Sequence, residues 1–147
     1  MKKERIMPKG HWDWPIKTPF SQGWRLSGDY DLIFVGGQIA VDEKFDVIGP
    51  GDIETQTRIV FENIRSVLRE AGADMCDIVK LNTFYCHEEG EEVEVEFWKK
   101  MTRVRLEFLP DPGPVGTAIR VKPGIAGMML EVEAIAAVPR VVPGERA

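Results

Sequence analysis

Acidic and apolar residues alternate along residues 130–136, close to the end of the chain, in the order Leu, Glu, Val, Glu, Ala, Ile, Ala. A two-residue period is that of a β-strand, because successive side chains of a strand point to opposite faces of a sheet. The segment therefore predicts a strand with one apolar face and with Glu131 and Glu133 together on the other. Residues 114–121 predict another strand, which a short glycine-rich turn joins to this one.

Two longer segments have the spacing of amphipathic helices. Between residues 53 and 71 the apolar residues recur every three or four positions, and this segment predicts a helix. Asp52 is a suitable N-cap before it, and Gly72 is a suitable stop after it. Residues 91–109 predict a second helix, whose acidic residues lie in its first half and basic residues in its second, which complements the helix dipole.

Three further segments favour strands. Residues 21–26 are a candidate strand, residues 32–35 are dense in β-forming side chains, and residues 77–86 carry apolar residues on both faces. Gly36 and Gly37 stand where the strand that begins at residue 32 should continue. Paired glycines inside a strand predict a bulge, or a close approach by a ligand or by another backbone.

The predicted order of elements is two strands, a helix, a strand, a helix and two strands. This order predicts an α+β fold, a mixed sheet with both helices on one face. The helices can cover only that face, and the other carries apolar residues such as Phe34, Ile119 and Val121. An uncovered apolar sheet face usually marks a subunit interface, so we expect an oligomer.

The chain of 147 residues has the length of one domain. Residues 1–19 predict an irregular N-terminal arm, packed onto the body by the rings of Trp12 and Trp14. Residues 20–140 form the single domain, and residues 141–147 are a C-terminal tail.

The composition excludes several classes of function. Hydrophobic content of 44% and charged content of 29% are typical of a soluble globular protein, and the net charge of −5 without a basic block excludes nucleic-acid and membrane partners. Cys76 and Cys86 form neither a disulfide framework nor a metal spacing, and His11 and His87 lie far apart. We therefore expect reduced thiols, no metal and a cytoplasmic protein. No apolar run follows the charged start, so we expect neither a signal peptide nor a membrane span.

Four stretches of the chain resemble the signature of the Rid family, the reactive intermediate deaminases, and the resemblance extends over roughly residues 20–138. The four stretches are residues 20–23, 32–39, 78–83 and 130–136. The resemblance implies a chorismate-mutase-like fold, a homotrimer and small-molecule sites in the clefts between subunits. Well-known members hydrolyse reactive imines and enamines to ammonia and a keto acid, and they need no cofactor or metal.

The resemblance also implies which residues form the site. In the family an arginine clamps the substrate carboxylate, and a glutamate on the last strand orients or activates the attacking water. The glutamate aligns with Glu131, whereas the arginine position holds Gly116. A tyrosine of the family aligns with Phe20, and a serine aligns with Gly36. These three changes remove hydrogen-bonding groups from one expected cleft, which fits a larger ligand, a ligand that is not an α-imino carboxylate, or a loss of catalysis.

Another cation is a candidate to replace the missing arginine. Arg120 lies four residues after Gly116, on the same face of the strand at about 13 Å along it, and is either a replacement or a solvated or ion-paired side chain. Arg25 and Arg105 are weaker candidates. Thr117, beside Gly116, completes the expected substrate-binding residues.

The leading hypothesis is a cofactor-independent hydrolase, a deaminase that acts on a small enamine, imine or related unsaturated nitrogen compound through Glu131. One alternative is a non-catalytic small-molecule-binding or regulatory trimer that kept the cleft and lost the chemistry. A further alternative is a tautomerase-type reaction of a dienol or enamine, again through Glu131. Turnover of a test imine separates the first hypothesis from the second.

Overall fold

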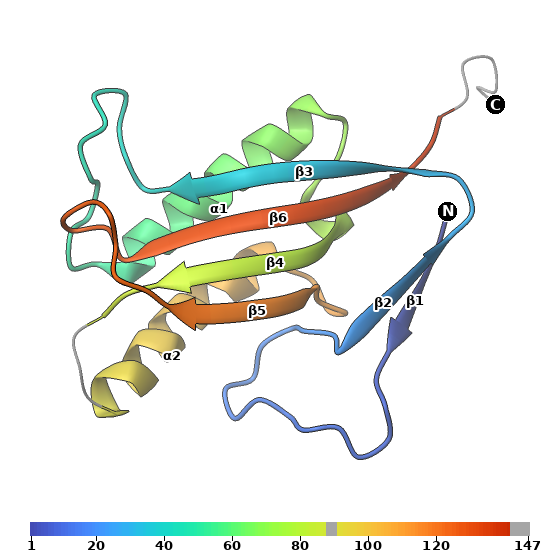
Figure 1. Ribbon diagram of the computed structural model, residues 1–147, viewed down its shortest axis with the longest axis horizontal. Coiled ribbons are helices and arrows are strands. Elements are labelled where there is room, and N and C mark those ends of the chain that lie inside the picture. The colour runs from blue at the N-terminus through green and yellow to red at the C-terminus, as the bar shows by residue number, and fades with distance from the viewer. Residues whose placement is uncertain (88–90, 142–147) are drawn as a thin grey trace.

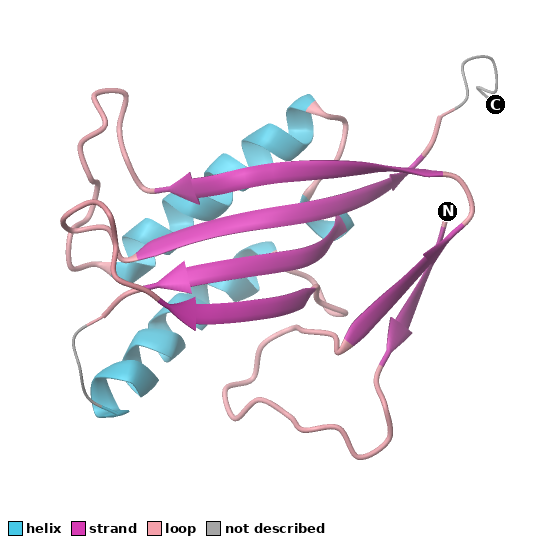
Figure 2. Cartoon of the chain, in the orientation of Figure 1, coloured by secondary structure: helices cyan, strands magenta, loops and turns pink. Residues whose placement is uncertain are grey.

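Four strands form one sheet, and two helices lie against one of its faces (Figures 1 and 2). The structure is a computed structural model that describes residues 1–87 and 91–141, so residues 142–147 of the predicted tail lie outside the described residues. The strands stand in the order β3 (Tyr30–Ile39), β6 (Leu130–Pro139), β4 (Ile78–Tyr85) and β5 (Val115–Arg120). The helices are α1 (Ile53–Glu70) and α2 (Glu91–Phe108), and the predicted α+β fold is confirmed. Within the described ranges, neither helix is long and apolar enough to cross a bilayer.

The predicted glycine-containing loop joins the last two strands, but they are not neighbours in the sheet. Strand β4 lies between them, antiparallel to β6 and parallel to β5. Parallel strands need a long crossover, and α2 supplies it between β4 and β5. Residues 121–129 then carry the chain past the end of β4 to its other side. The sheet is therefore mixed, as predicted, with β5 as one of its edges.

Strand β6 has the predicted alternation of faces. Its residues on the helix side are fully buried, whereas Glu131 and Glu133 are half-buried on the other face. The buried set packs into the core beneath the helices and consists of Leu130, Val132, Ala134 and Ala136. Removing these side chains from water is a main source of the free energy that holds the sheet against the helices.

Helix α1 begins and ends where the sequence predicts. The Asp52 carboxylate accepts hydrogen bonds from the backbone N–H groups of Glu54, at 3.1 Å, and Thr55, at 3.2 Å. Gly72 follows the helix with φ of 75°, a left-handed conformation that favours glycine. Local capping therefore fixes both ends of the helix.

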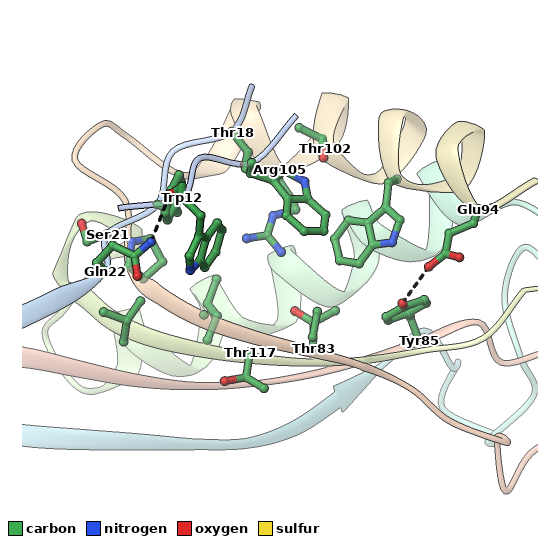
Figure 3. A pocket seen from close by; sticks show the side chains of 18 residues that line it. Trp12, Thr18, Ser21, Gln22, Thr83, Tyr85, Glu94, Thr102, Arg105 and Thr117 are labelled. Carbon is green, nitrogen blue, oxygen red and sulfur yellow. Dashed lines mark hydrogen bonds between the residues drawn. The ribbon is translucent and has the colours of Figure 1, made fainter. Parts of the chain in front are cut away.

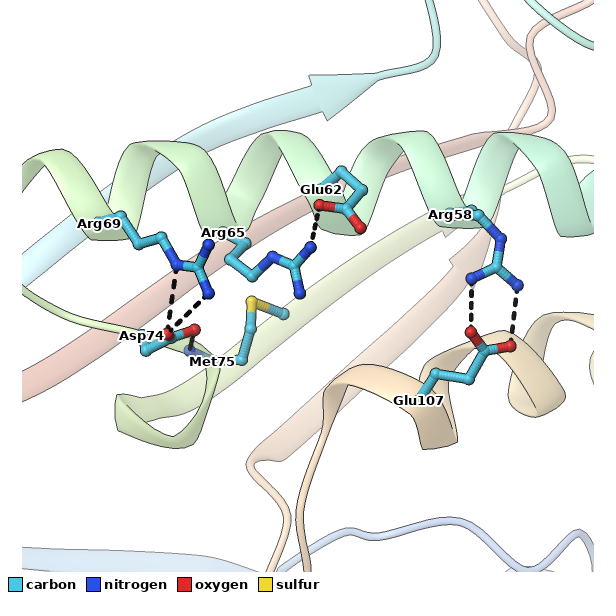
Figure 4. Close-up of polar contacts among 7 residues, drawn as sticks. All are labelled: Arg58, Glu62, Arg65, Arg69, Asp74, Met75 and Glu107. Atoms are coloured by element: carbon cyan, nitrogen blue, oxygen red, sulfur yellow. Dashed lines mark hydrogen bonds and ion pairs between the residues drawn. The ribbon is translucent and has the colours of Figure 1, made fainter.

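Ion pairs link α1 to its neighbours on the exposed side (Figure 4). The Arg58 guanidinium donates two hydrogen bonds to the Glu107 carboxylate and so joins α1 to α2. The Arg69 guanidinium donates to Asp74, whose carboxylate also caps the short helical turn at Met75–Asp77. Exposed pairs of this kind add little stability. The apolar core therefore supplies most of the free energy that holds the two helices together.

Strand β3 contains the predicted bulge. Its pairing with β6 shifts register between Val35 and Gln38, where Gly36 and Gly37 stand. A Cβ atom added at Gly37 would overlap the Glu131 carboxylate, so the group that approaches these glycines is a side chain of β6. Gly37 therefore makes room for Glu131, whereas a Cβ atom at Gly36 would meet no neighbour within 4 Å.

The prediction of an irregular arm over residues 1–19 is wrong in its first part. Lys2–Ile6 forms β1, which pairs antiparallel with β2 (Gly23–Ser27) as a two-stranded ribbon separate from the main sheet. The ribbon is largely exposed, so its strand carries no apolar alternation that would reveal it in the sequence. Trp12 and Trp14 do pack by their rings, on Phe20 and Trp98.

The face of the sheet opposite the helices carries exposed apolar side chains. On β3, Phe34 is 70% exposed and Leu32 is exposed beside it; on β5, at the opposite edge of the sheet, Ile119 is 50% exposed, whereas Val121, just after β5, is half-buried. Exposed apolar side chains at both edges of one sheet face are of the kind that protein contacts normally cover. We propose that copies of this chain cover this face in a homotrimer.

The first prediction concerns this assembly. Sedimentation equilibrium should give a homotrimer at micromolar concentration, and Phe34→Asp should shift the protein towards the monomer because it places a charge on the covered face. Phe45→Asp is the matched control, since Phe45 is 62% exposed in a loop outside the sheet. A wild-type monomer at that concentration would contradict the proposed assembly.

Candidate functional site

A cavity of ≈ 280 Å³ lies beside the β5 edge of the sheet (Figure 3). Three parts of the chain surround it: strands β4 and β5, helix α2, and the segment that precedes β2. Its walls combine aromatic rings with hydroxyl, amide and charged groups. The principal lining residues are Trp12, Trp14, Phe20, Gln22, Thr83, Tyr85, Glu94, Trp98, Thr102, Arg105, Gly116 and Ala118.

Small residues of β5 make room for the cavity. Gly116 pairs with Leu81 and Ala118 pairs with Thr83, so both face the helix side of the sheet. A Cβ atom at Gly116 would meet only the Leu81 carbonyl oxygen, at 3.7 Å, which is an ordinary contact. A larger residue would fit the backbone there, and the glycine therefore leaves space that a side chain would otherwise fill.

One face of α2 forms the opposite wall. Glu94, Trp98, Thr102 and Arg105 follow one another at spacings of four, four and three residues, which places them in a row along the helix. This row differs from the stripe of α2 that packs into the core, which consists of Phe97, Met101, Val104 and Phe108. One face of α2 therefore packs into the core, and another lines the cavity.

The segment before β2 closes the third side because it is fastened to the turn before β5. The Ser21 hydroxyl donates to the Gly113 carbonyl at 2.6 Å, and the Trp24 indole N–H donates to the same oxygen at 3.2 Å. A Cβ atom at Gly113 would overlap the backbone of Pro19, so only glycine permits this approach. Trp12 stacks on Phe20 with ring centroids 5.6 Å apart.

Arg105 brings a positive charge to the cavity. Its guanidinium points into the space between Trp12 and Tyr85 in Figure 3, and its central carbon lies 6.0 Å from the centroid of the buried Phe61 ring. Among the residues that the structure describes, none accepts a hydrogen bond from this guanidinium or forms an ion pair with it. Burial lowers the pKa of Arg105 to about 10, so the group still carries its charge at neutral pH.

A hydrogen-bonded pair lies at the Tyr85 end of the cavity. The Tyr85 hydroxyl donates to the Glu94 carboxylate at 3.2 Å. Burial is the main cause that raises the pKa of Tyr85 above its usual value. The Tyr85 ring also packs edge-on against Trp98, with centroids 5.0 Å apart. The cavity therefore offers a cation, a carboxylate and a phenol within aromatic walls.

The structure divides the residues that the sequence predicted for the site between the two faces of the sheet. Phe20 and Gly116 line the cavity, and Thr117 borders it from β5, although its register with Asn82 turns its side chain to the other face.

Glu131 and the bulge that contains Gly36 lie together on the face opposite the helices. A single protomer therefore does not bring Glu131 to the cavity that Gly116 lines.

Arg120 does share the face of Gly116, as predicted, because it pairs with Tyr85 in the register of β5. Its guanidinium donates to the His87 carbonyl at 3.1 Å and does not line the cavity. Arg25 forms an ion pair with Glu4 at 3.5 Å. The cation beside Gly116 is Arg105, which the sequence analysis gave only as a weaker candidate. The row of polar and aromatic residues on α2, outside its apolar stripe, is the signal that could have identified it.

The chain matches known proteins over most of its length. Residues 15–138 match the family model described as Endoribonuclease L-PSP. A RutC family protein of Pyrococcus abyssi is 34% identical over 118 residues, which span 80% of this chain and 85% of that protein. The 3-aminoacrylate deaminase RutC of Acinetobacter baylyi is 25% identical over 136 residues, which span 92% of this chain and 98% of that one.

A solved structure of a Rid family protein of unknown function from Yersinia pestis superposes with a TM-score of 0.69. The superposition covers 94% of this chain and all of that one, at 23% sequence identity, and it supports the fold. With the family model matched over residues 15–138, the chain belongs to the Rid family.

Over residues 1–87 and 91–141, no cluster of three or more His, Cys, Asp and Glu side chains is placed to hold a metal ion. Both cysteines are free thiols; Cys76 is exposed and Cys86 is half-buried.

The second prediction concerns the stability effect of Arg105. Arg105→Met should leave the free energy of unfolding unchanged or raise it, because it removes a half-buried charge that has no counter-ion among the described groups. Urea unfolding followed by circular dichroism measures this. A loss of about 1.5–3 kcal/mol, the size of a hydrogen bond to a charged group, would show that Arg105 is paired within the protein.

Proposed function

We propose that the protein is a cofactor-independent deaminase that hydrolyses a small unsaturated nitrogen compound bearing a carboxylate. The observation that carries this proposal is the Arg105 guanidinium, which faces the cavity beside Gly116 without a hydrogen-bond partner among the described residues. A half-buried cation in a ligand-sized cavity is a binding group for an anion. Similarity to a relative named 3-aminoacrylate deaminase supports the reaction class.

In this proposal Arg105 replaces the arginine that the family carries at the position of Gly116. A guanidinium offers planar, paired N–H donors that match the two oxygens of a carboxylate. Arg105 reaches the cavity from α2, whereas the family residue would reach it from β5. The charge is thus kept in the same cavity, and the space above β5 becomes available to the substrate.

The proposed acid–base group is the Glu131 carboxylate of a neighbouring subunit. Within one protomer, Glu131 lies on the uncovered face of the sheet, flanked in register by Ile39 and Phe84. This is the face that we propose to be covered in the trimer, so an interface there would carry Glu131 to the edge of the next protomer's cavity.

The reaction then needs one water and no cofactor. Glu131 accepts a proton from water as the oxygen adds to the carbon of the C=N bond, and it returns this proton to nitrogen, which gives a neutral carbinolamine. The same carboxylate then takes the carbinolamine hydroxyl proton and passes it to nitrogen as the C–N bond breaks, so that ammonia leaves and a keto acid remains. Arg105 holds the substrate carboxylate throughout and keeps the reacting carbon in place.

The third prediction tests the two residues by turnover. Imines produced in situ by an amino-acid oxidase should disappear faster with the protein than without it, measured as a fall in semicarbazide-trapped product. Glu131→Gln should lower the rate by about 100-fold or more, since positioned acid–base groups contribute on this scale. Arg105→Met should raise KM strongly, because it removes the carboxylate clamp.

The controls are the neighbouring residues of the same type. Glu133→Gln changes the next carboxylate on the same face of β6, and Arg103→Met changes an arginine of α2 that is paired with Glu54 at 2.8 Å on the exposed side. Both should retain the wild-type rate. Substrate binding without any turnover would contradict the deaminase and favour the non-catalytic binding trimer.

The fourth prediction tests whether two subunits share the site. At substrate concentrations well below the raised KM of Arg105→Met, the Arg105→Met and Glu131→Gln proteins should each be nearly inactive alone, and they should recover part of the wild-type rate when they are co-expressed and form mixed trimers. Some cavities then pair an intact Arg105 with an intact Glu131 from the neighbour. Mixed trimers without activity, confirmed as mixed by native mass spectrometry, would contradict the shared site.

A further inference from the structure

The cavity has more room than a three-carbon imino or enamino acid fills. Its volume of ≈ 280 Å³ lies just below the range, about 300–1,000 Å³, of pockets that bind drug-sized molecules. Gly116 and Ala118 line this room from β5, where the strand presents no bulky side chain. Neither a positive φ nor a close contact requires glycine at position 116, so the space is not a by-product of the backbone.

Aromatic rings form most of the apolar wall. The edges of Trp14 and Tyr85 both pack against Trp98, at interplanar angles of 67° and 75° and centroid distances of 5.7 and 5.0 Å. These two contacts fix the plane of the Trp98 ring, which lines the cavity and is only half-buried. A ring held in this way, with accessible surface towards a cavity, is a preformed platform for a planar ligand.

The opposite side of the cavity carries a second aromatic pair. Trp12 lies parallel to Phe20, at an interplanar angle of 8°, and remains 63% exposed. An exposed indole next to a cavity loses unfavourable contact with water when a flat apolar group covers it. Arg105, Trp98 and Trp12 therefore surround one space and combine a cation with aromatic surfaces.

From this arrangement we infer that the site selects substrates that carry both a carboxylate and an aromatic side chain. The carboxylate binds the Arg105 guanidinium, and the ring occupies the space above Gly116 and Ala118 between the indoles. The substrates are thus the 2-imino or enamino acids derived from aromatic amino acids. This inference rests on the proposed function for the reaction, but the selection is a property of binding and is measured without turnover.

Three related ligands separate the contributions of the aromatic ring and of the carboxylate to binding affinity. Phenylpyruvate carries both groups, pyruvate lacks the ring, and phenylacetone lacks the carboxylate. Isothermal titration calorimetry on the wild-type protein should give phenylpyruvate at least about tenfold tighter binding than pyruvate, since even one methylene in an apolar pocket is worth about 10–200-fold. Phenylacetone should also bind at least about tenfold more weakly than phenylpyruvate.

Two variants assign these differences to residues. Gly116→Leu should abolish the preference for phenylpyruvate and retain pyruvate binding, because the new side chain fills the space for the ring and leaves Arg105 in place. Arg105→Met should reduce phenylpyruvate to the affinity of phenylacetone. The matched control is Gly124→Leu, which adds the same side chain at an exposed glycine of the loop between β5 and β6, away from the cavity, and should change neither affinity.

The comparison of ligands on the wild-type protein decides the inference by itself. Equal affinity for pyruvate and phenylpyruvate would overturn it, and so would a Gly116→Leu variant that keeps the full preference. Tight phenylpyruvate binding without turnover of any imine supports the aromatic selection while contradicting the deaminase. Rapid turnover of alanine-derived imine without any preference for the ring supports the deaminase and contradicts the selection.

Discussion

The central strand β6 organises the molecule through its two-residue alternation. It pairs with β3 on one side and β4 on the other, so its two faces define the two sides of the sheet. Its apolar residues face the helices and build the core, whereas Glu131 and Glu133 face the other way. The cavity lies on the helix side and Glu131 lies on the uncovered side. A site that uses both must therefore be completed by a second copy of the chain.

On the helix side, the unusual group is the Arg105 guanidinium. Moving a charge out of water without a counter-ion disfavours the folded state, and burial accordingly lowers the pKa of Arg105. The Phe61 ring beneath it compensates only in part, because a cation over a benzene ring is stabilised less than a paired ion. A residue that lowers stability in this way is typical of a functional site, where binding supplies the missing partner.

Local patterns predicted most of the fold from the sequence. The capped helix after Asp52, the glycine bulge of β3 and the alternation of β6 follow from short-range spacing, and the structure confirms all three. The ribbon strand β1 could not be predicted because its exposed residues need no apolar alternation. Strand order also escaped prediction, since local spacing does not reveal that β4 separates β5 from β6.

For the site, the sequence identified Gly116 and Phe20 as cavity residues but ranked Arg120 above Arg105. The sequence spacing allows either arginine to reach the cavity. Only the folded structure distinguishes them: Arg105 lines the cavity between α2, β5 and the segment before β2, whereas Arg120 donates to the His87 carbonyl.

A crystal structure with 4-bromophenylpyruvate tests the central claim most directly, because the anomalous signal of bromine locates the ring. The account predicts bromine beside Trp98 and the carboxylate within hydrogen-bonding distance of the Arg105 guanidinium. Bromine on the uncovered sheet face, or an Arg105 guanidinium bound to a protein carboxylate instead of the ligand, would contradict it.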